Sequence, residues 1–355
     1  MLNRRQFIRS AAATGAAFHM AYSSELKPNR LRCGILGLDH AHGLDVLKVL
    51  QESPDYELVG VCEPDDTVAA RFASLPAAQG VTWLTKDELL RDKSVSMIAV
   101  ESGVPRLLAL AREAVDAGKH VHMDKPAGAS LPEFDALLNA ARERSLLFQM
   151  GYMFRYNPGF DFIRRAVKEG WLGRIHSISA SICTDLDSTK RERIAQFPGG
   201  LMFELGCHLI DMTVLLLGPP SKVTPFIRHD SSNNDALADN TLAVLEFPHT
   251  IVTVESSAME PQAFATRRFK IVGENGSIVL NPIEPPSARL ALRDGAGGFE
   301  KGSHTVAFDD LERHVLDFAD LAACIRGERT FAYDKDRDLL VQKTVLQAGG
   351  MPAAM

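Results

Sequence analysis

The sequence predicts an α/β protein: an N-terminal doubly wound parallel sheet, followed by a C-terminal α+β domain with a largely antiparallel, open sheet. Over residues 30–150, short apolar runs alternate with stretches of helical periodicity, as in sheets built from strand–helix–strand units. From residue 151 onward the chain is rich in β-type segments separated by Gly and Pro turns, which favours antiparallel pairing. A length of 355 residues suits two such domains.

The first domain is expected over residues 30–150, and its elements can be placed in order. Each apolar run is bounded by turn residues, and the intervening segments carry apolar residues three or four positions apart. In a parallel sheet of this kind, ligands bind at the carboxyl ends of the strands. We expect strands at 30–38, 56–65, 94–102, 120–126 and 146–154, and helices at 42–53, 68–75, 104–119 and 131–145.

The second domain is expected over residues 151–355 and begins with a helix closed by Gly170. Residues 294–304 are expected to form a mobile loop, and the last helix is expected to return and brace the first domain. We expect strands at 175–184, 241–248, 250–260, 269–282 and 288–294, and late helices at 309–327 and 334–349.

Composition narrows the possible classes of partner. A formal net charge of −6 argues against nucleic acid. No apolar run reaches the roughly 20 residues of a membrane helix, so no integral span is expected. The five cysteines (Cys33, Cys62, Cys183, Cys207 and Cys324) follow no disulfide or metal-binding spacing.

Residues 1–29 are predicted to be a signal and linker rather than part of the fold. Arg4 and Arg5 are followed by Gln6, Phe7 and a mild Ala/Gly stretch, which resembles a twin-arginine export signal. The alternative is a frayed basic terminus. The resemblance predicts a periplasmic or otherwise exported protein, with cleavage between residues 17 and 24.

The segment GILGLDHAHG, residues 34–43, lies where a dinucleotide-binding loop is expected. Glycines in such a loop let a pyrophosphate approach the backbone at a helix N-terminus. If Gly37 is the first glycine of the fingerprint, Asp39 replaces the second and His42 the third, with Gly43 one place late. The alternative is a plain strand–helix turn in which Asp39 caps the helix.

Two charged residues end strands of the same sheet. Glu63 follows Gly37 by 26 residues and can accept hydrogen bonds from the ribose of NAD, while repelling the 2′-phosphate of NADP. A solvated acidic turn is the alternative. Lys125 precedes a proline at a strand end, where it can hydrogen-bond a substrate hydroxyl. Taken alone, an ordinary surface lysine is the competing interpretation.

The segment ELGCHLID offers a possible proton acceptor. Glu204 and His208 are four residues apart, so they share one face of a predicted helix, and Asp211 can orient the imidazole. A helix cap with a buried histidine is one alternative, and a metal site using Glu204, Cys207 and His208 is another. His40 also suggests a metal ligand, as does the nearby His42, but we expect both to line the cofactor loop and expect no metal.

Five segments together resemble the Gfo/Idh/MocA oxidoreductases over residues 30–350. They are AGKHVHMDKP, GYMFRYNPGF, GWLGRIHSI, GGLMFELGCHLIDMTVLLLG and FKIVGENGSIVLNP. The resemblance implies a Rossmann domain in which Lys125 and His208 match the catalytic lysine and histidine, and Glu204 takes the place of an aspartate. Asp124 replaces the usual Glu before the lysine, and AVESGVP at 99–105 departs from the family pattern.

The resemblance implies hydride transfer between a secondary hydroxyl of a sugar, cyclitol or glycoside and a tightly bound NAD, with NADP less favoured. It also implies a homodimer or homotetramer. A glycosidase acting by transient oxidation and a non-catalytic sugar-binding protein are the alternatives. The expected cofactor contacts are Gly34, Gly37, Leu38, Asp39, His40, Glu63, Glu101 and Lys125. The expected substrate contacts are Tyr152, Arg155 and Asp211.

Overall fold

The computed structural model describes residues 30–309 and 312–354. Its first part is a five-stranded, all-parallel sheet with strand order β2-β1-β3-β4-β5. The order reverses between β1 and β3, and the ends of these strands are therefore where a ligand is expected. The strands are β1 (Leu31–Leu36), β2 (Tyr56–Cys62), β3 (Met97–Val100), β4 (His120–Met123) and β5 (Phe148–Met150).

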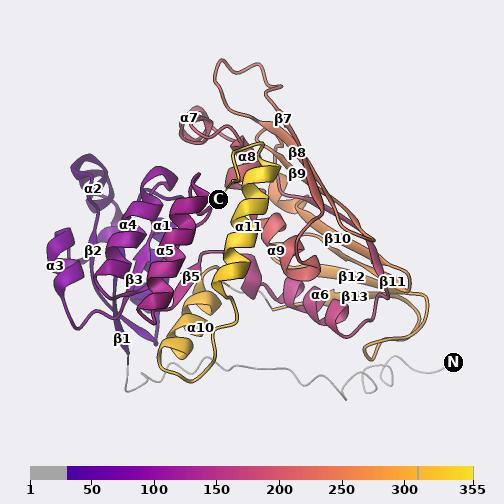
Figure 1. Cartoon of the computed structure of the whole chain (residues 1–355), viewed down its shortest axis with the longest axis horizontal. Coiled ribbons are helices and arrows are strands. Elements are labelled where there is room, and N and C mark those ends of the chain that lie inside the picture. The colour runs from indigo at the N-terminus through magenta and orange to yellow at the C-terminus, as the bar shows by residue number, and fades with distance from the viewer. Residues whose placement is uncertain (1–29, 310–311, 355) are drawn as a thin grey trace.

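Helices cover both faces of this sheet (Figure 1). On one face, α1 packs its buried Val46, Leu47 and Leu50 in a cluster that also includes Phe318 and Leu321 from α10. The other face is covered by α4 and α5, whose apolar stripes belong to the main core. The bounds are α1 (Gly43–Glu52), α2 (Asp66–Ala73), α3 (Lys86–Arg91), α4 (Val104–Asp116), α5 (Leu131–Glu143) and α10 (Val315–Ile325).

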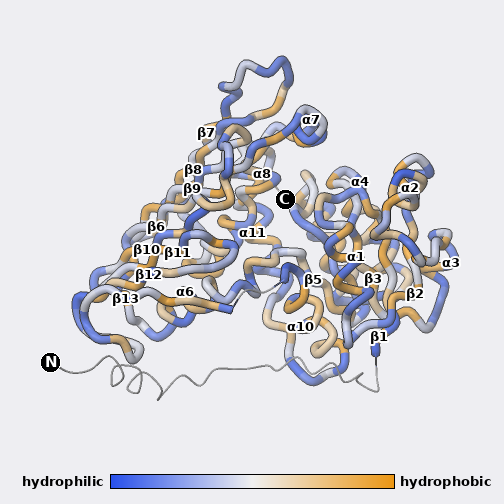
Figure 2. Tube along the Cα trace, turned by 180° about the vertical axis from the view of Figure 1, so that it is seen from behind, coloured by the Kyte–Doolittle hydropathy of each residue, from blue (hydrophilic) through white to orange (hydrophobic). Residues whose placement is uncertain are grey.

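The second part is an eight-stranded sheet with order β13-β12-β11-β10-β6-β9-β8-β7. All its pairs are antiparallel except β6–β9, which confirms the mostly antiparallel sheet expected from the sequence. Hydrophobic residues gather along the strands, and hydrophilic ones dominate the outer loops (Figure 2). The strands are β6 (Ile175–Ser181), β7 (Lys222–Arg228), β8 (Asn240–Glu246), β9 (Ile251–Ser257), β10 (Arg268–Gly273), β11 (Gly276–Leu280), β12 (Ser287–Leu292) and β13 (Gly302–Ala307).

Helices between the two sheets position the candidate site. The side chain of Gln342 in α11 accepts a hydrogen bond from the main chain of Ala127 and donates one to Gly128. The last helix therefore contacts the first part of the chain, just after β4. The bounds are α6 (Pro158–Lys168), α7 (Ser188–Ala195), α8 (Gly200–Glu204), α9 (Cys207–Leu217) and α11 (Lys335–Ala348).

Several elements differ from the sequence expectation. Helix α3 and strands β7 and β13 were not anticipated. A capping box between Thr85 and Glu88 begins α3, a local signal that its short length obscured. Strand β13 begins inside the predicted mobile loop, so that loop prediction is wrong for its last residues. Helix α10 begins later than expected because His314 has a left-handed backbone, with φ of 64°.

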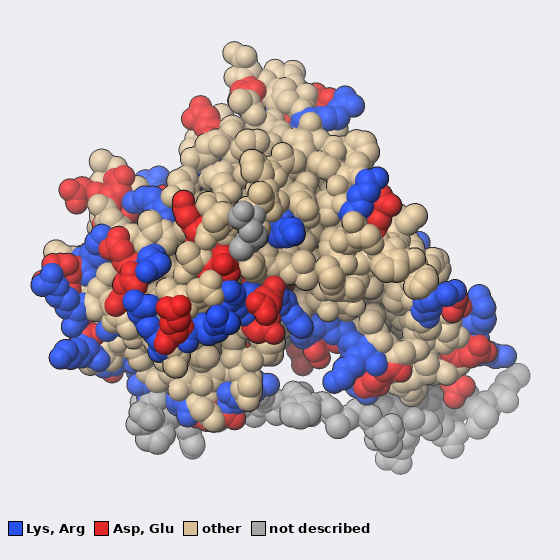
Figure 3. All heavy atoms as spheres, in the orientation of Figure 1, with Lys and Arg blue, Asp and Glu red and all other residues tan. Residues whose placement is uncertain are grey.

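The surface charge, the cysteines and the absence of a membrane-crossing helix in the described residues can be compared with the sequence expectations. Acidic and basic side chains are interspersed on the face shown in Figure 3. Among the described residues, no helix combines the length and apolar character needed to cross a membrane. All five cysteines are buried and unpaired. The predicted signal at 1–29 lies outside the described residues.

Candidate active site

The candidate site forms where the carboxyl end of β4 meets the junction of α8 and α9. The ammonium of Lys125 donates to the Glu204 carboxylate at 3.3 Å and to the Glu204 main-chain oxygen at 2.9 Å. Although burial alone lowers it, the Glu204 carboxylate raises the pKa of Lys125. The lysine is therefore a buried, charged hydrogen-bond donor.

Glu204 and His208 do not share one continuous helix, which corrects the sequence prediction. Helix α8 ends at Glu204 and α9 begins at Cys207, with Leu205 and Gly206 between them. A Cβ at Gly206 would lie 2.7 Å from the main-chain oxygen of Met202, so the tight junction requires glycine. After this break, the Glu204 carboxylate contacts Lys125, and His208 lies within electrostatic range of the same ammonium.

His208 is buried among aromatic rings. Its ring centroid lies 4.9 Å from that of Phe154, 6.1 Å from Tyr152 and 6.4 Å from His42. Burial, followed by the charge of Lys125, lowers the pKa of His208 well below its ordinary range. Its Nδ1 has no hydrogen-bond partner within the described ranges. His208 is thus a neutral imidazole that can accept a proton, beside the Tyr152 ring.

Asp211 does not orient His208, contrary to the sequence prediction. Its carboxylate accepts from Arg155, with Nη2–Oδ1 at 2.7 Å and Nε–Oδ1 at 3.1 Å. Arg155 also donates to Asp338 at 2.6 Å, and all three side chains are almost completely buried. The predicted substrate contacts of Arg155 and Asp211 are therefore replaced by a structural ion cluster that joins η2 (Met153–Tyr156), α9 and α11.

Glycines shape the loop between β1 and α1. Gly37 has φ of +85°, and a Cβ there would lie 2.9 Å from the Cα of Ser102. A Cβ at Gly43 would lie 2.6 Å from the main-chain oxygen of Leu38. Both positions therefore require glycine, for the sharp turn and for the close approach of α1. Gly43 performs the packing role of the fingerprint's third glycine, one residue late.

Asp39 turns away from α1 and caps α4. Its Oδ1 accepts from the main-chain N–H of Gly103, the N-cap of α4, at 2.5 Å, and from the Ser102 hydroxyl at 3.2 Å. Its Oδ2 lies 2.9 Å from Nη2 of Arg106. The predicted cap of α1 is wrong, because His42 is that helix's N-cap and makes no side-chain capping bond. The negative charge of Asp39, at the position of the fingerprint's second glycine, is thus balanced by the N-terminus of α4 and by the Arg106 guanidinium.

Glu63 holds the loop from the end of β2. Its carboxylate accepts from the N–H of Leu38 at 2.7 Å and the N–H of Asp65 at 3.0 Å. Arg106 covers it, with an Nη1–Oε1 distance of 3.1 Å. The carboxylate therefore stands where a ribose is expected, and the Arg106 guanidinium is paired with it.

The Glu101 side chain contacts His122. Its carboxylate lies 3.3 Å from Nδ1 of His122, and Asp317 lies 3.7 Å from the other ring nitrogen of that histidine. Burial raises the pKa of Glu101 to about 7. Only its main-chain oxygen reaches the loop, accepting from His40 at 2.9 Å. The predicted cofactor contact of the Glu101 side chain is therefore not supported, because that side chain belongs to a fully buried charge cluster.

Two histidines of the loop reach the end of β4. Asp124 contacts both His40 and His42, the latter with Nδ1–Oδ distances of 3.0 and 3.2 Å. Sequence reasoning noted the two histidines but did not pair them with Asp124, because the carboxylate lies 82 residues beyond His42 and only the sheet brings it near.

The residues fit a dinucleotide in three respects. The Gly37 turn, the Glu63 carboxylate at the end of β2 and the Lys125 donor at the end of β4 line one edge of the parallel sheet. The charge of Asp39, the residue that departs from the fingerprint, is already paired with Arg106. These are the residues that would hold an NAD.

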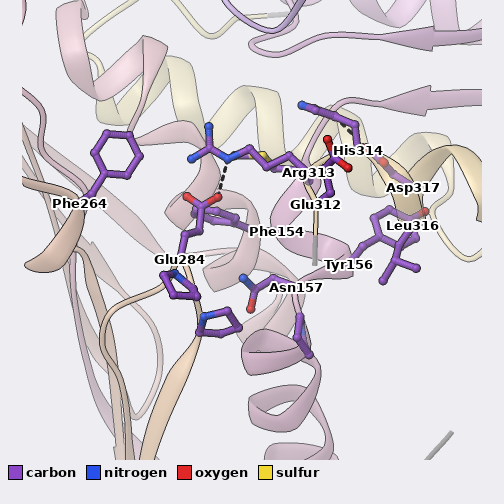
Figure 4. A pocket seen from close by; sticks show the side chains of 14 residues that line it. Phe154, Tyr156, Asn157, Phe264, Glu284, Glu312, Arg313, His314, Leu316 and Asp317 are labelled. Carbon is purple, nitrogen blue, oxygen red and sulfur yellow. Dashed lines mark hydrogen bonds and ion pairs between the residues drawn. The ribbon is translucent and has the colours of Figure 1, made fainter. Parts of the chain in front are cut away.

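A cavity of about 390 Å³ lies beside the site, between η2, α10 and the loop after β11 (Figure 4). Polar groups line it, including Asn157, Glu284 and Arg313, and Nε of Arg313 donates to Glu284 at 2.6 Å. Its lining does not include Lys125, Glu204 or His208. The link to the site is His314, whose ring centroid lies 5.0 Å from that of His42.

Two parts of the chain match models of known protein families. Residues 31–152 match an oxidoreductase family with an NAD-binding Rossmann fold, and residues 160–279 match the GFO/IDH/MocA C-terminal domain. The chain belongs to the Gfo/Idh/MocA oxidoreductases. It is therefore an oxidoreductase whose N-terminal part is an NAD-binding Rossmann domain, as the sequence resemblance implied.

Several similar proteins have names that state a sugar or a cyclitol as their substrate. A dTDP-3,4-didehydro-2,6-dideoxy-alpha-D-glucose 3-reductase from Streptomyces violaceoruber is 27% identical, over 73% of this chain and 75% of its own. The scyllo-inositol 2-dehydrogenase (NAD(+)) of Bacillus subtilis is 22% identical, over 85% and 88%. A levoglucosan dehydrogenase solved with NADH and levoglucosan has a TM-score of 0.75 at 17% identity, covering 90% and 96% of the two chains.

Proposed function

We propose that this Gfo/Idh/MocA protein is an exported oxidoreductase that moves a hydride between a secondary hydroxyl of a carbohydrate and a tightly held NAD. The observation that carries the proposal is the meeting of a charged Lys125 with Glu204 and a neutral His208 at the carboxyl end of β4. A proton acceptor and a fixed donor beside one oxygen are what oxidation of an alcohol needs.

Each residue has a role at the substrate hydroxyl. Nζ of Lys125 donates to the hydroxyl oxygen and stabilises its developing negative charge. The imidazole of His208 accepts the hydroxyl proton, and its aromatic surroundings exclude water. Glu204 keeps Lys125 charged and in place. A bound NAD would supply the hydride-accepting chemistry for the carbon that carries this hydroxyl.

Carbohydrate is the proposed substrate class, and the names of the similar proteins support it. The cavity supplies groups that suit a polyol: the Asn157 amide, the Glu284 carboxylate and the Arg313 guanidinium. NAD is proposed over NADP because the Glu63 carboxylate disfavours a 2′-phosphate.

Export is proposed from Arg4 and Arg5 and the residues that follow them. Free NAD should be scarce outside the cytoplasm, so an exported enzyme would carry its cofactor from the cytoplasm and regenerate it in place. A homodimer or homotetramer is proposed as well, because Phe226 in β7 and Ile251 in β9 are 51% and 62% exposed at the end of the large sheet where β8 lies between these two strands.

The first test is the cofactor content of the full chain purified from the cytoplasm. We expect near-stoichiometric NAD after denaturation, measured by mass spectrometry. A screen of sugars and glycosides with an artificial electron acceptor should then find turnover that falls by 10²- to 10⁴-fold in His208→Asn and in Lys125→Met. His176→Asn, an exposed histidine elsewhere, is the matched control.

Three outcomes separate the alternatives. Net oxidation of a sugar supports the proposal. Release of free sugar from a glycoside without any acceptor supports the glycosidase. Sugar binding that survives Lys125→Met, with no turnover by the wild type and no NAD, supports a binding protein and rejects the enzyme.

A further inference from the structure

The geometry points to a divalent transition-metal site formed by His40, His42 and Asp124, and we propose that the protein binds one such ion there. One ring nitrogen of each histidine and a carboxylate oxygen of Asp124 all lie within 4.8 Å of one another. This inference is independent of the hydride-transfer proposal, since it concerns ion binding rather than turnover.

The spacing of His42 and Asp124 suits a metal. Nδ1 of His42 lies 3.0 Å from Oδ2 and 3.2 Å from Oδ1 of Asp124, and Nδ1 of His40 contacts the same Oδ2. Ligands bound about 2.1 Å from an ion are roughly 3.0 to 3.4 Å apart in octahedral or tetrahedral geometry. The separations between His42 and Asp124 match those of a coordination sphere, whereas Nδ1 of His40 is in closer contact with the same Oδ2 and would move back to admit an ion.

The main chain fixes the three ligands before any ion arrives. The N–H of His40 donates to the Glu101 oxygen at 2.9 Å, and the His40 oxygen accepts from Gly43 at 3.1 Å. The N–H of Asp124 donates to Val100 at 3.1 Å. Both ligand-bearing segments are thus tied to the end of β3, the strand that lies between β1 and β4.

One outer group orients a ligand of the proposed site, the carboxylate of Asp124. Oδ1 of Asp124 accepts the N–H of Lys125 at 2.6 Å, which orients the carboxylate. Nε2 of His40 has no hydrogen-bond partner within the described residues, and a Glu204 carboxylate oxygen lies 3.8 Å from it. Because the Lys125 ammonium is paired with Glu204, the Asp124 carboxylate can bind an ion.

The donor set selects the class of ion. Two imidazoles and one carboxylate suit Zn²⁺, Fe²⁺, Mn²⁺ or Co²⁺ better than Ca²⁺ or Mg²⁺, which take oxygen ligands. Three protein ligands leave at least one position for water or a substrate oxygen. Of the side chains around the site, His42 and Glu204 are 12% and 13% exposed, so an open position would face the side that these two residues line.

A second histidine cluster, His122 with His314 and Asp317, is less suited to an ion. Its side chains are almost completely buried. His122 already lies between two carboxylates, Glu101 at 3.3 Å and Asp317 at 3.7 Å. That arrangement resembles an internal ion pair rather than an accessible coordination site.

The test is metal binding by the full chain carrying no histidine tag. After dialysis against a chelator, the protein is titrated with Co²⁺, and bound ion is counted by elemental mass spectrometry and by the visible spectrum of the complex. We expect one ion per chain. We expect His42→Ala and the isosteric Asp124→Asn to weaken binding by at least roughly 100-fold, more than the loss of an outer group.

Two controls keep the result interpretable. His176→Ala should bind like the wild type, and circular dichroism should show that the ligand variants remain folded. X-ray absorption of the Co²⁺-loaded wild type gives a readout without any variant, and should show imidazole and oxygen scattering. Absence of stoichiometric binding, a sulfur ligand from Cys207, or loss of the ion in His314→Gln with retention in His42→Ala would each overturn the proposal.

Discussion

The role of Asp39 as the cap of α4 can be measured by Asp39→Gly, which also restores the glycine usual at this position. The variant loses a side-chain capping bond to Gly103, about 1 kcal/mol. It loses a partly exposed ion pair with Arg106, roughly 0.5 kcal/mol after screening. The glycine adds about 0.5 kcal/mol of unfolded-chain entropy. The sum is a destabilisation of about 2 kcal/mol.

Hydrogen exchange localises this effect. Opening of the first turn of α4 should become roughly 30-fold more frequent in Asp39→Gly, read by mass spectrometry on the peptide spanning 102–110. Asp39→Asn is the matched control, because asparagine caps well but has no charge, and it should lose only the ion-pair part. Exchange in Asp39→Gly equal to the wild type refutes the reasoning. Equal damage in both variants would assign the effect to Arg106.

Three further predictions follow from buried and exposed groups. Asp211→Asn should lower the free energy of unfolding by roughly 3 kcal/mol in urea denaturation, because Arg155 keeps only part of its buried ion pairing. The KM for the sugar should stay unchanged. A raised KM at unchanged stability contradicts the structural role of Asp211. Burial alone would lower the pKa of His122, but the carboxylates of Asp317 and Glu101 raise it from 6.5 to about 10. The contribution of His122 to the free energy of unfolding is therefore complete below pH 6.5 and is lost as the pH rises toward 10. His122→Gln should flatten this part of the profile of urea midpoint against pH, and an unchanged profile refutes the pairing. Phe226→Asp should halve the mass measured by light scattering if the proposed dimer forms through that face, and an unchanged mass rejects that interface.

Much of the site could be predicted because its signals are local. The Gly37 turn, the carboxylate of Glu63 and the lysine before Pro126 each lie within two residues of the end of a strand. Residues at the carboxyl ends of parallel strands meet at one edge, so their proximity follows from strand order alone. The same local reasoning failed at α8–α9, where a glycine junction interrupts what the four-residue spacing of Glu204 and His208 predicted as one helix.

The sequence by itself determined the two-sheet class, the edge that carries the site and the family, because periodicity, turn residues and short motifs are properties of neighbouring residues. Tertiary structure decided the partner of each charged side chain. Asp39 caps α4, 64 residues away, and Asp211 pairs with Arg155 rather than His208. Hydrogen bonds and ion pairs form between groups that folding brings within about 3 Å, and no spacing along the chain encodes which group that is.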